Sequence, residues 1–217
     1  MNIDNYQIKA QSSNSKKFSR AIRVWHWANA ILISISLLIV LVNFTILKPE
    51  NNISYVQSML GKMQDVNQEK NTIALCRFFS DKLWVVHAYI GFGISALLIF
   101  RIVSAVFTKQ RTGFLGRGGI QILATRTDRH TKGVRIVYSI FYTLISIMAI
   151  TGLSVAYQGL IPFLAGNSNV IKILLDLHYY TMYGIVAFAV IHLLGVLLAE
   201  KTANRGIVSD MINGGKV

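Results

Sequence analysis

The stretch LHYYTMYGIVAFAVIHLLGVLLA at residues 177–199 has no charged side chain and contains two histidines. A helix crosses the hydrocarbon layer of a membrane with about 20 apolar residues. Because lipid offers the backbone no hydrogen-bonding partner, a single spanning segment of this kind has to be an α-helix. The stretch therefore predicts a transmembrane helix, and its two ionisable side chains require a reason to be there.

Three further apolar runs lie at about 22–47, 83–107 and 135–157, and within the second only Arg101 carries a charge. Of the 217 residues, 53% are apolar and 14% are charged, against about 25% charged in soluble domains. The first run is too long for the apolar part of a signal peptide, which indicates a permanent span. We expect an all-α membrane protein, a four-transmembrane-helix bundle formed by a single domain over residues 1–217.

The charges divide unequally between the two ends of this bundle. The side with both termini and the 108–135 connection has 16 basic and four acidic residues, and the other side has six basic and five acidic residues. Loops rich in Lys and Arg stay in the cytoplasm, so both termini are expected there, in a multi-pass protein of the bacterial inner membrane. The net charge of +13 then reflects topology and contact with membrane lipid, and we expect no nucleic-acid partner.

The only cysteine is Cys76. A single thiol forms no internal disulfide, and it cannot supply the several thiolates of a zinc or iron–sulfur site. We expect Cys76 to be a small buried or loop residue.

Four of the five histidines lie within the apolar runs or at their edges, namely His26, His87, His178 and His192. The last two are 14 residues apart, so they project from nearly the same face of one helix, about 21 Å apart along its axis. In a hydrocarbon layer of about 30 Å, this spacing places one of them near each side.

Chain direction sorts the four histidines into two pairs. The fourth helix runs inward, so His178 is outer and His192 is inner. The first helix starts on the inner side with His26, and the second starts on the outer side with His87. We therefore expect an inner pair, His26 and His192, and an outer pair, His87 and His178. Histidines that made only local hydrogen bonds, the alternative, would have no reason to pair by depth.

The chemistry of paired imidazoles favours one kind of ligand. Two imidazoles that face each other suit the axial positions of a haem iron, and a haem with both positions filled carries electrons and does not activate oxygen. Zinc would need about four ligands, and Asp176 at the outer depth points about 160° away from His178. The sequence thus predicts two haems, with the four histidines as iron ligands and no catalytic residue.

Two arginines lie near the inner depth. Arg101 follows His87 by 14 residues on the same face, and Arg23 precedes His26. Both are candidates for contact with an inner haem propionate or with lipid phosphate, and snorkelling to the headgroups is the simpler alternative.

Several segments resemble bacterial di-haem cytochromes b that serve periplasmic-facing dehydrogenases. These segments are RVWHW at 23–27, HAYIG at 87–91, LLIFR at 97–101 and TG at 151–152. The C-terminal part, with His178, His192, Glu200 and SDMING at 209–214, resembles the b-type cytochrome subunit of membrane nickel–iron hydrogenases. Cytochrome b subunits of formate dehydrogenase and thiosulfate reductase share the four-histidine pattern.

The resemblance implies two haems b and an electron-transfer subunit of an oxidoreductase complex. A hydrogenase-like, iron–sulfur-containing dehydrogenase subunit on the outer face would give electrons. The quinone pool, menaquinone or ubiquinone, would receive them near the inner face, which amounts to quinone reductase activity. Candidate quinone contacts at about that depth are Asn29, Tyr138, Ser139 and Tyr142, with ordinary bundle polarity as the alternative.

A second hypothesis keeps the same ligands and reverses the electron flow. The chain would then be a stand-alone quinol-oxidising cytochrome b that reduces a small periplasmic acceptor such as superoxide or ferric iron. The polar loop expected at 48–82 would cap an acceptor site instead of docking a protein. A haem-free carrier or assembly protein is a third hypothesis, and it leaves the depth pairing unexplained.

Overall fold

The structure, a computed structural model, describes residues 18–48, 52, 58, 68–107, 129–202 and 206–215. Its helices are α2 (Arg20–Thr45), α4 (Gln68–Phe107), α6 (Arg129–Ala156), α7 (Ser168–Lys201) and the short α8 (Ile207–Asn213). The N-terminal tail, most of the 48–67 segment and the connection at 108–128 lie outside the described residues.

The four long helices are each long and apolar enough to cross a membrane. Their outward side chains are large and apolar, as at Ile150, Ile191 and Leu198, and only 6% of the most apolar stretch of α7 is buried within the protein. A soluble protein would not leave such a surface in water. The expectation of an all-α membrane protein with four spanning helices is confirmed.

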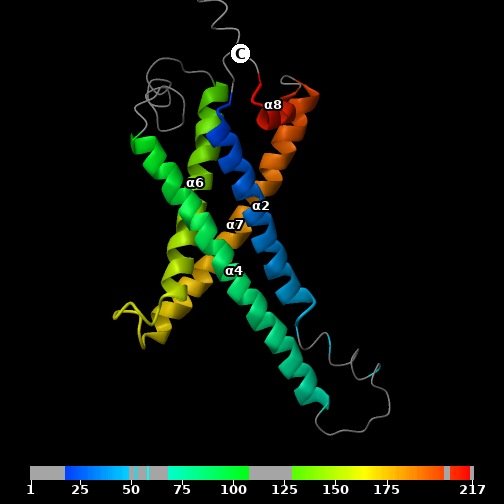
Figure 1. Ribbon diagram of the computed structural model, residues 1–217, viewed down its shortest axis with the longest axis vertical. Coiled ribbons are helices and arrows are strands. Elements are labelled where there is room, and N and C mark those ends of the chain that lie inside the picture. Colours follow the sequence, from blue (N-terminus) through cyan, green and yellow to red (C-terminus); the bar gives the residue numbers. More distant parts are fainter. Residues whose placement is uncertain are drawn as a thin grey trace, which may run out of the picture.

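The helices alternate in direction. Figure 1 shows the starts of α2 and α6 and the ends of α4 and α7 at one end of the molecule, where α8 also lies. Helix α6 packs against α7, and α4 packs against both α2 and α6. Leu98, Ile145 and Ile185, from α4, α6 and α7, form the buried centre of the bundle. The core is small because most apolar side chains face outward.

Three helices begin earlier than the hydropathy pattern predicts. Helix α4 begins at residue 68 instead of about 83, α6 at 129 instead of about 135, and α7 at 168 instead of about 177. The expected polar loop at 48–82 is thus wrong for residues 68–82, which are helical. Hydropathy marks the part of a helix that lies in lipid, whereas intrahelical hydrogen bonds also form where the helix is in water. In Figure 1 the start of α4 reaches beyond the other helices.

The turn before α7 shows how local sequence ends one helix and starts the next. Gly166 has a φ of 85°, a left-handed conformation that costs glycine little. Asn167 follows as the N-cap, and its side chain accepts a hydrogen bond from the backbone N–H of Val170 at 3.3 Å. Such a cap satisfies one of the free N–H groups in the first helical turn.

At the other end of α7, Glu200 holds the short helix α8 in place. Its two carboxylate oxygens accept hydrogen bonds from the backbone N–H groups of Gly206, at 2.8 Å, and Val208, at 3.3 Å. The backbone N–H of Phe18 donates to the carbonyl of Gly214 at 3.0 Å. The segment after α7 therefore folds back onto the start of α2.

Candidate functional site

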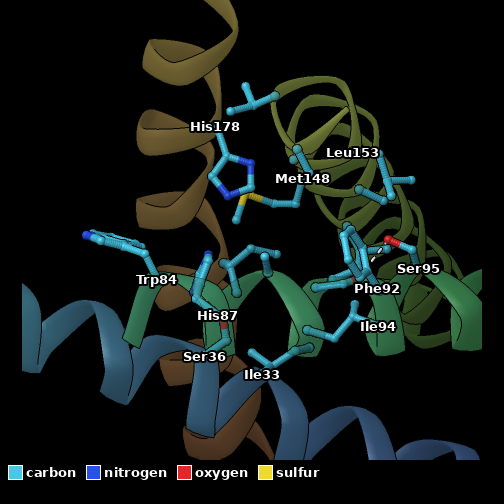
Figure 2. A pocket seen from close by; sticks show the side chains of 18 of the residues that line it. Ile33, Ser36, Trp84, His87, Phe92, Ile94, Ser95, Met148, Leu153 and His178 are labelled. Carbon is cyan, nitrogen blue, oxygen red and sulfur yellow. Dashed lines mark hydrogen bonds between the residues drawn. The ribbon is translucent and has the colours of Figure 1, made fainter. Parts of the chain in front are cut away.

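The outer pair consists of His87 on α4 and His178 on α7. Their ring centres are 6.3 Å apart, with an angle of 79° between the ring planes. Figure 2 shows His178 directed across the space between the helices toward His87. Two residues that lie 91 positions apart in the chain thus face each other, as the depth argument expects.

A hydroxyl group lies beside each imidazole of the outer pair. The Ser36 Oγ is 3.1 Å from the Nδ1 of His87, and the Thr151 Oγ1 is 2.9 Å from the Nδ1 of His178. A histidine that binds a metal commonly uses its second ring nitrogen in a hydrogen bond of this kind, which fixes the ring orientation. The Nε2 atoms are therefore the ones available to a shared ligand.

An apolar cavity of about 280 Å³ adjoins the outer pair. A single water needs only about 15 Å³ of such space, so the cavity is large enough for an extended flat group. Figure 2 shows both histidines at its edge, with Phe92, Met148 and Leu153 among the residues around it. Gly91 and Gly152 also line the cavity, where the lack of a side chain leaves room.

The inner pair consists of His26 on α2 and His192 on α7, with ring centres 6.2 Å apart and 56° between the planes. The ring of Phe188 lies parallel to that of His192, with centres 5.8 Å apart. The edge of Trp27 meets His26 at 5.4 Å between ring centres. Within the described part of the chain, the buried Nδ1 of His26 has no hydrogen-bond partner, so the two pairs differ in their surroundings.

The spacing of both pairs tests which group they could hold. An imidazole nitrogen bonds a transition metal at about 2 Å and the ring centre lies about 1 Å behind it, so two rings on opposite sides of one iron have centres about 6 Å apart. The observed distances of 6.2 and 6.3 Å agree with this value. The described residues bring together no group of three or more metal-ligating side chains, which disfavours zinc. Opposed imidazoles beside an apolar cavity fit a haem.

The structure gives the two arginines different surroundings. Arg23 donates from its guanidinium to the backbone carbonyl of Ile212 in α8. Arg101 donates from Nε to the hydroxyl of Tyr142 at 3.3 Å, and its guanidinium carbon lies 5.8 Å from the centre of the Trp25 ring. A cation over an indole ring is a favourable arrangement. Arg101 is therefore the arginine that lies inside the bundle, beside Trp25, the residue before His26 in the chain. Arg23 instead joins α2 to α8.

The four candidate quinone contacts do not form one group. Asn29 is buried, and its side-chain amide donates to the carbonyl of Trp25 at 2.8 Å, within its own helix. Tyr142 stacks on Trp25, with ring centres 6.1 Å apart. Tyr138 and Ser139 are exposed on α6. The geometry of Asn29 is that of ordinary bundle polarity, whereas Tyr138 and Ser139 lie on the surface of α6 and Tyr142 is partly buried against the core of the bundle.

Three contacts in and beside the site do not follow from the sequence pattern. Ser36 reaches His87 from a different helix, and the only signal in the sequence is a polar side chain within an apolar run, which needs a partner in lipid. The contacts of α8 with Arg23 and with the indole N–H of Trp27, which lies 3.4 Å from the carbonyl of Met211, have no signal in the spacing at all.

Four membrane-spanning helices with opposed imidazoles at two levels define a class of protein, the membrane-embedded b-type cytochromes. A comparison with protein families agrees, because the sequence profile of prokaryotic cytochrome b561 matches residues 17–214. The chain belongs to the prokaryotic cytochrome b561 family, whose members bind b haem and transfer electrons across a membrane. No curated protein and no solved structure matched the chain.

Proposed function

We propose that this single-domain cytochrome holds two haems b, one between His26 and His192 and one between His87 and His178. The observation that carries the proposal is the equal spacing of the two pairs, 6.2 and 6.3 Å between ring centres. Both pairs take one histidine from α7, so this helix fixes the separation of the two sites. A haem with two histidine ligands supplies reversible one-electron transfer and has no open position for oxygen.

The partners proposed for this electron transfer are a dehydrogenase and a quinone. We propose that an iron–sulfur-containing, hydrogenase-like subunit docks on the outer face and that menaquinone or ubiquinone reacts near the inner face. The resemblance of His178, His192, Glu200 and 209–214 to hydrogenase cytochrome subunits supports the first partner. The hydroxyl groups of Tyr138, Ser139 and Tyr142 on α6 support the second, because a hydroxyl group can donate a hydrogen bond to a quinone carbonyl.

The orientation proposed is that of a multi-pass protein of the bacterial inner membrane with both termini in the cytoplasm. The 16 basic residues on the side of the termini, against six on the other side, support it. Arg101 and Arg23 then belong to the cytoplasmic half. Arg101 is the better candidate for contact with an inner propionate, because its guanidinium lies inside the bundle over the ring of Trp25, whereas that of Arg23 is directed to α8.

The test is the haem content of purified, haem-replete protein. We expect two haems per chain with a low-spin spectrum, and one haem per chain after His192→Ala, with quinone reduction lost. His130→Ala is the control, since this histidine belongs to neither pair, and it should keep both haems. A His192→Ala protein with undiminished haem content would refute the pairing. A stable iron–sulfur partner in the preparation supports the dehydrogenase role, and full activity of the lone chain supports the stand-alone cytochrome.

A further inference from the structure

The outer pair differs from the inner pair in what lies behind its imidazoles. Both outer rings have a hydroxyl oxygen close to Nδ1, at 3.1 Å for Ser36 with His87 and at 2.9 Å for Thr151 with His178. The Nδ1 of His26 in the inner pair is buried and has no hydrogen-bond partner among the residues that the structure describes. The two sites therefore present chemically different ligands, although all four ligands are histidines.

The direction of the hydrogen bond at Thr151 follows from its other contact. The Thr151 hydroxyl has one hydrogen, and the carbonyl of Ile147 lies 2.7 Å from its oxygen, within the same helix. Because that hydrogen is used in the bond to Ile147, the hydroxyl oxygen has to accept a hydrogen from the Nδ1–H of His178. Thr151 is only 2% exposed, so water does not replace either bond.

This arrangement selects one tautomer of His178. With the proton on Nδ1, the lone pair of Nε2 is free to bind a metal on the side of the ring that faces His87. At His87, the Ser36 hydroxyl lies 3.1 Å from Nδ1 and can accept the Nδ1 proton when the imidazole binds a metal through Nε2. His178 is thus prepared as a ligand before any cofactor is bound, and Ser36 can support the same tautomer of His87.

The hydrogen bonds also change how strongly the imidazoles donate electrons. An imidazole whose N–H is engaged by an acceptor gains basicity and becomes a stronger ligand. A stronger donor favours the oxidised form of a bound iron, and therefore lowers its reduction potential. At the inner end, the positive charge of Arg101 lies 5.8 Å from the ring of Trp25, the neighbour of His26, and a nearby cation favours the reduced form, which carries less positive charge.

We propose that Ser36 and Thr151 are positioning residues that lower the reduction potential of the outer site below that of the inner site, so that electrons run from the outer pair to the inner pair. The inference rests on the proposed function, because it requires a haem at each pair. In this direction an external iron–sulfur donor loses one electron at a time. A quinone near the inner face takes up two electrons and two protons to become a quinol.

The experiment is a potentiometric titration of the wild-type protein and of Thr151→Val, followed by the optical spectrum and by electron paramagnetic resonance. Valine keeps the shape of threonine and removes the hydroxyl. We expect two components in the wild type, and an upward shift of the lower midpoint potential in Thr151→Val with the higher one unchanged. Thr151→Ser should restore the wild-type value. Thr181→Val is the matched control, since Thr181 is also buried and, among the residues that the structure describes, its hydroxyl donates to the carbonyl of Leu177 in its own helix.

The outcomes separate this inference from the proposed function. Fewer than two haems in the wild type would refute the proposed function itself. Two haems with both potentials unchanged in Thr151→Val, or a His178→Ala protein that loses the higher-potential component, would overturn the inference alone. If Thr151→Val loses the outer haem, Ser36→Ala is measured in its place and should also raise the lower midpoint potential. An unchanged lower potential in Ser36→Ala counts against the inference.

Discussion

Gly152 on α6 lies directly against the imidazole of His178 on α7. A Cβ atom placed on Gly152 would be 3.1 Å from Cε1 and 3.6 Å from Nδ1 of that ring. The first distance is shorter than ordinary van der Waals contact. The absence of a side chain at residue 152 therefore allows the His178 ring to reach the hydroxyl of Thr151, which is on α6 with Gly152. The Nε2 of the ring can then point at His87.

The first prediction concerns this contact. Gly152→Val should displace the His178 ring and lower the haem content from two toward one per chain, because the added methyl groups occupy the place of the imidazole. The measurement is haem per chain in purified protein. Gly195→Val on α7 is the control, since a Cβ there meets nothing within 4 Å. This substitution has the same cost of placing a β-branched residue in a helix. Equal haem content in the two variants would show that the contact is unimportant.

The second prediction concerns the charge inside the bundle. Arg101→Gln should lower the higher midpoint potential, because it removes the cation beside Trp25 and Tyr142 that favours the reduced form. The lower potential should change less, since the outer pair is farther away. Lys82→Gln on the same helix is the control, as Lys82 lies over the ring of Phe78 near the other end. A shift confined to the lower potential would contradict the placement of Arg101 near the inner site.

The third prediction concerns the attachment of α8. Glu200→Ala should speed hydrogen exchange at the backbone amides of Gly206 and Val208, which donate to the Glu200 carboxylate. Loosening α8 should also speed exchange at Phe18, whose N–H is bonded to Gly214. Glu200→Gln keeps one acceptor oxygen and should give an intermediate rate. If exchange in Glu200→Ala matched the wild type, the carboxylate would not be what holds the helix.

The fourth prediction concerns orientation. A fluorescent protein fused after Val217 should fluoresce and alkaline phosphatase fused at the same place should be inactive, because the basic side of the bundle faces the cytoplasm. Fusions within the turn at 157–167 should give the opposite pair of results. The turn is a suitable control because it joins α6 to α7 at the end of the bundle away from α8 (Figure 1). Active phosphatase at the C-terminus would reverse the orientation.

The sequence alone was sufficient for the four spans and for the partners in each histidine pair. An apolar composition is enough to predict a helix in lipid, because the α-helix is the only structure in which a single spanning segment satisfies its own backbone hydrogen bonds. The pairing follows from the spacing of His178 and His192 on one helix and from the alternation of chain direction. Spacing along the chain and alternation of chain direction are both properties of the sequence, so they do not depend on how the helices pack.

The tertiary structure decided which atoms surround those histidines. The Ser36 hydroxyl beside His87, the Thr151 hydroxyl beside His178 and the carbonyl of Ile212 beside Arg23 all join residues from different helices. Such contacts depend on how far each helix is rotated and shifted against its neighbour, which packing of the side chains sets. Composition and periodicity fix which face of a helix is polar, but not which atom of the adjacent helix that face meets.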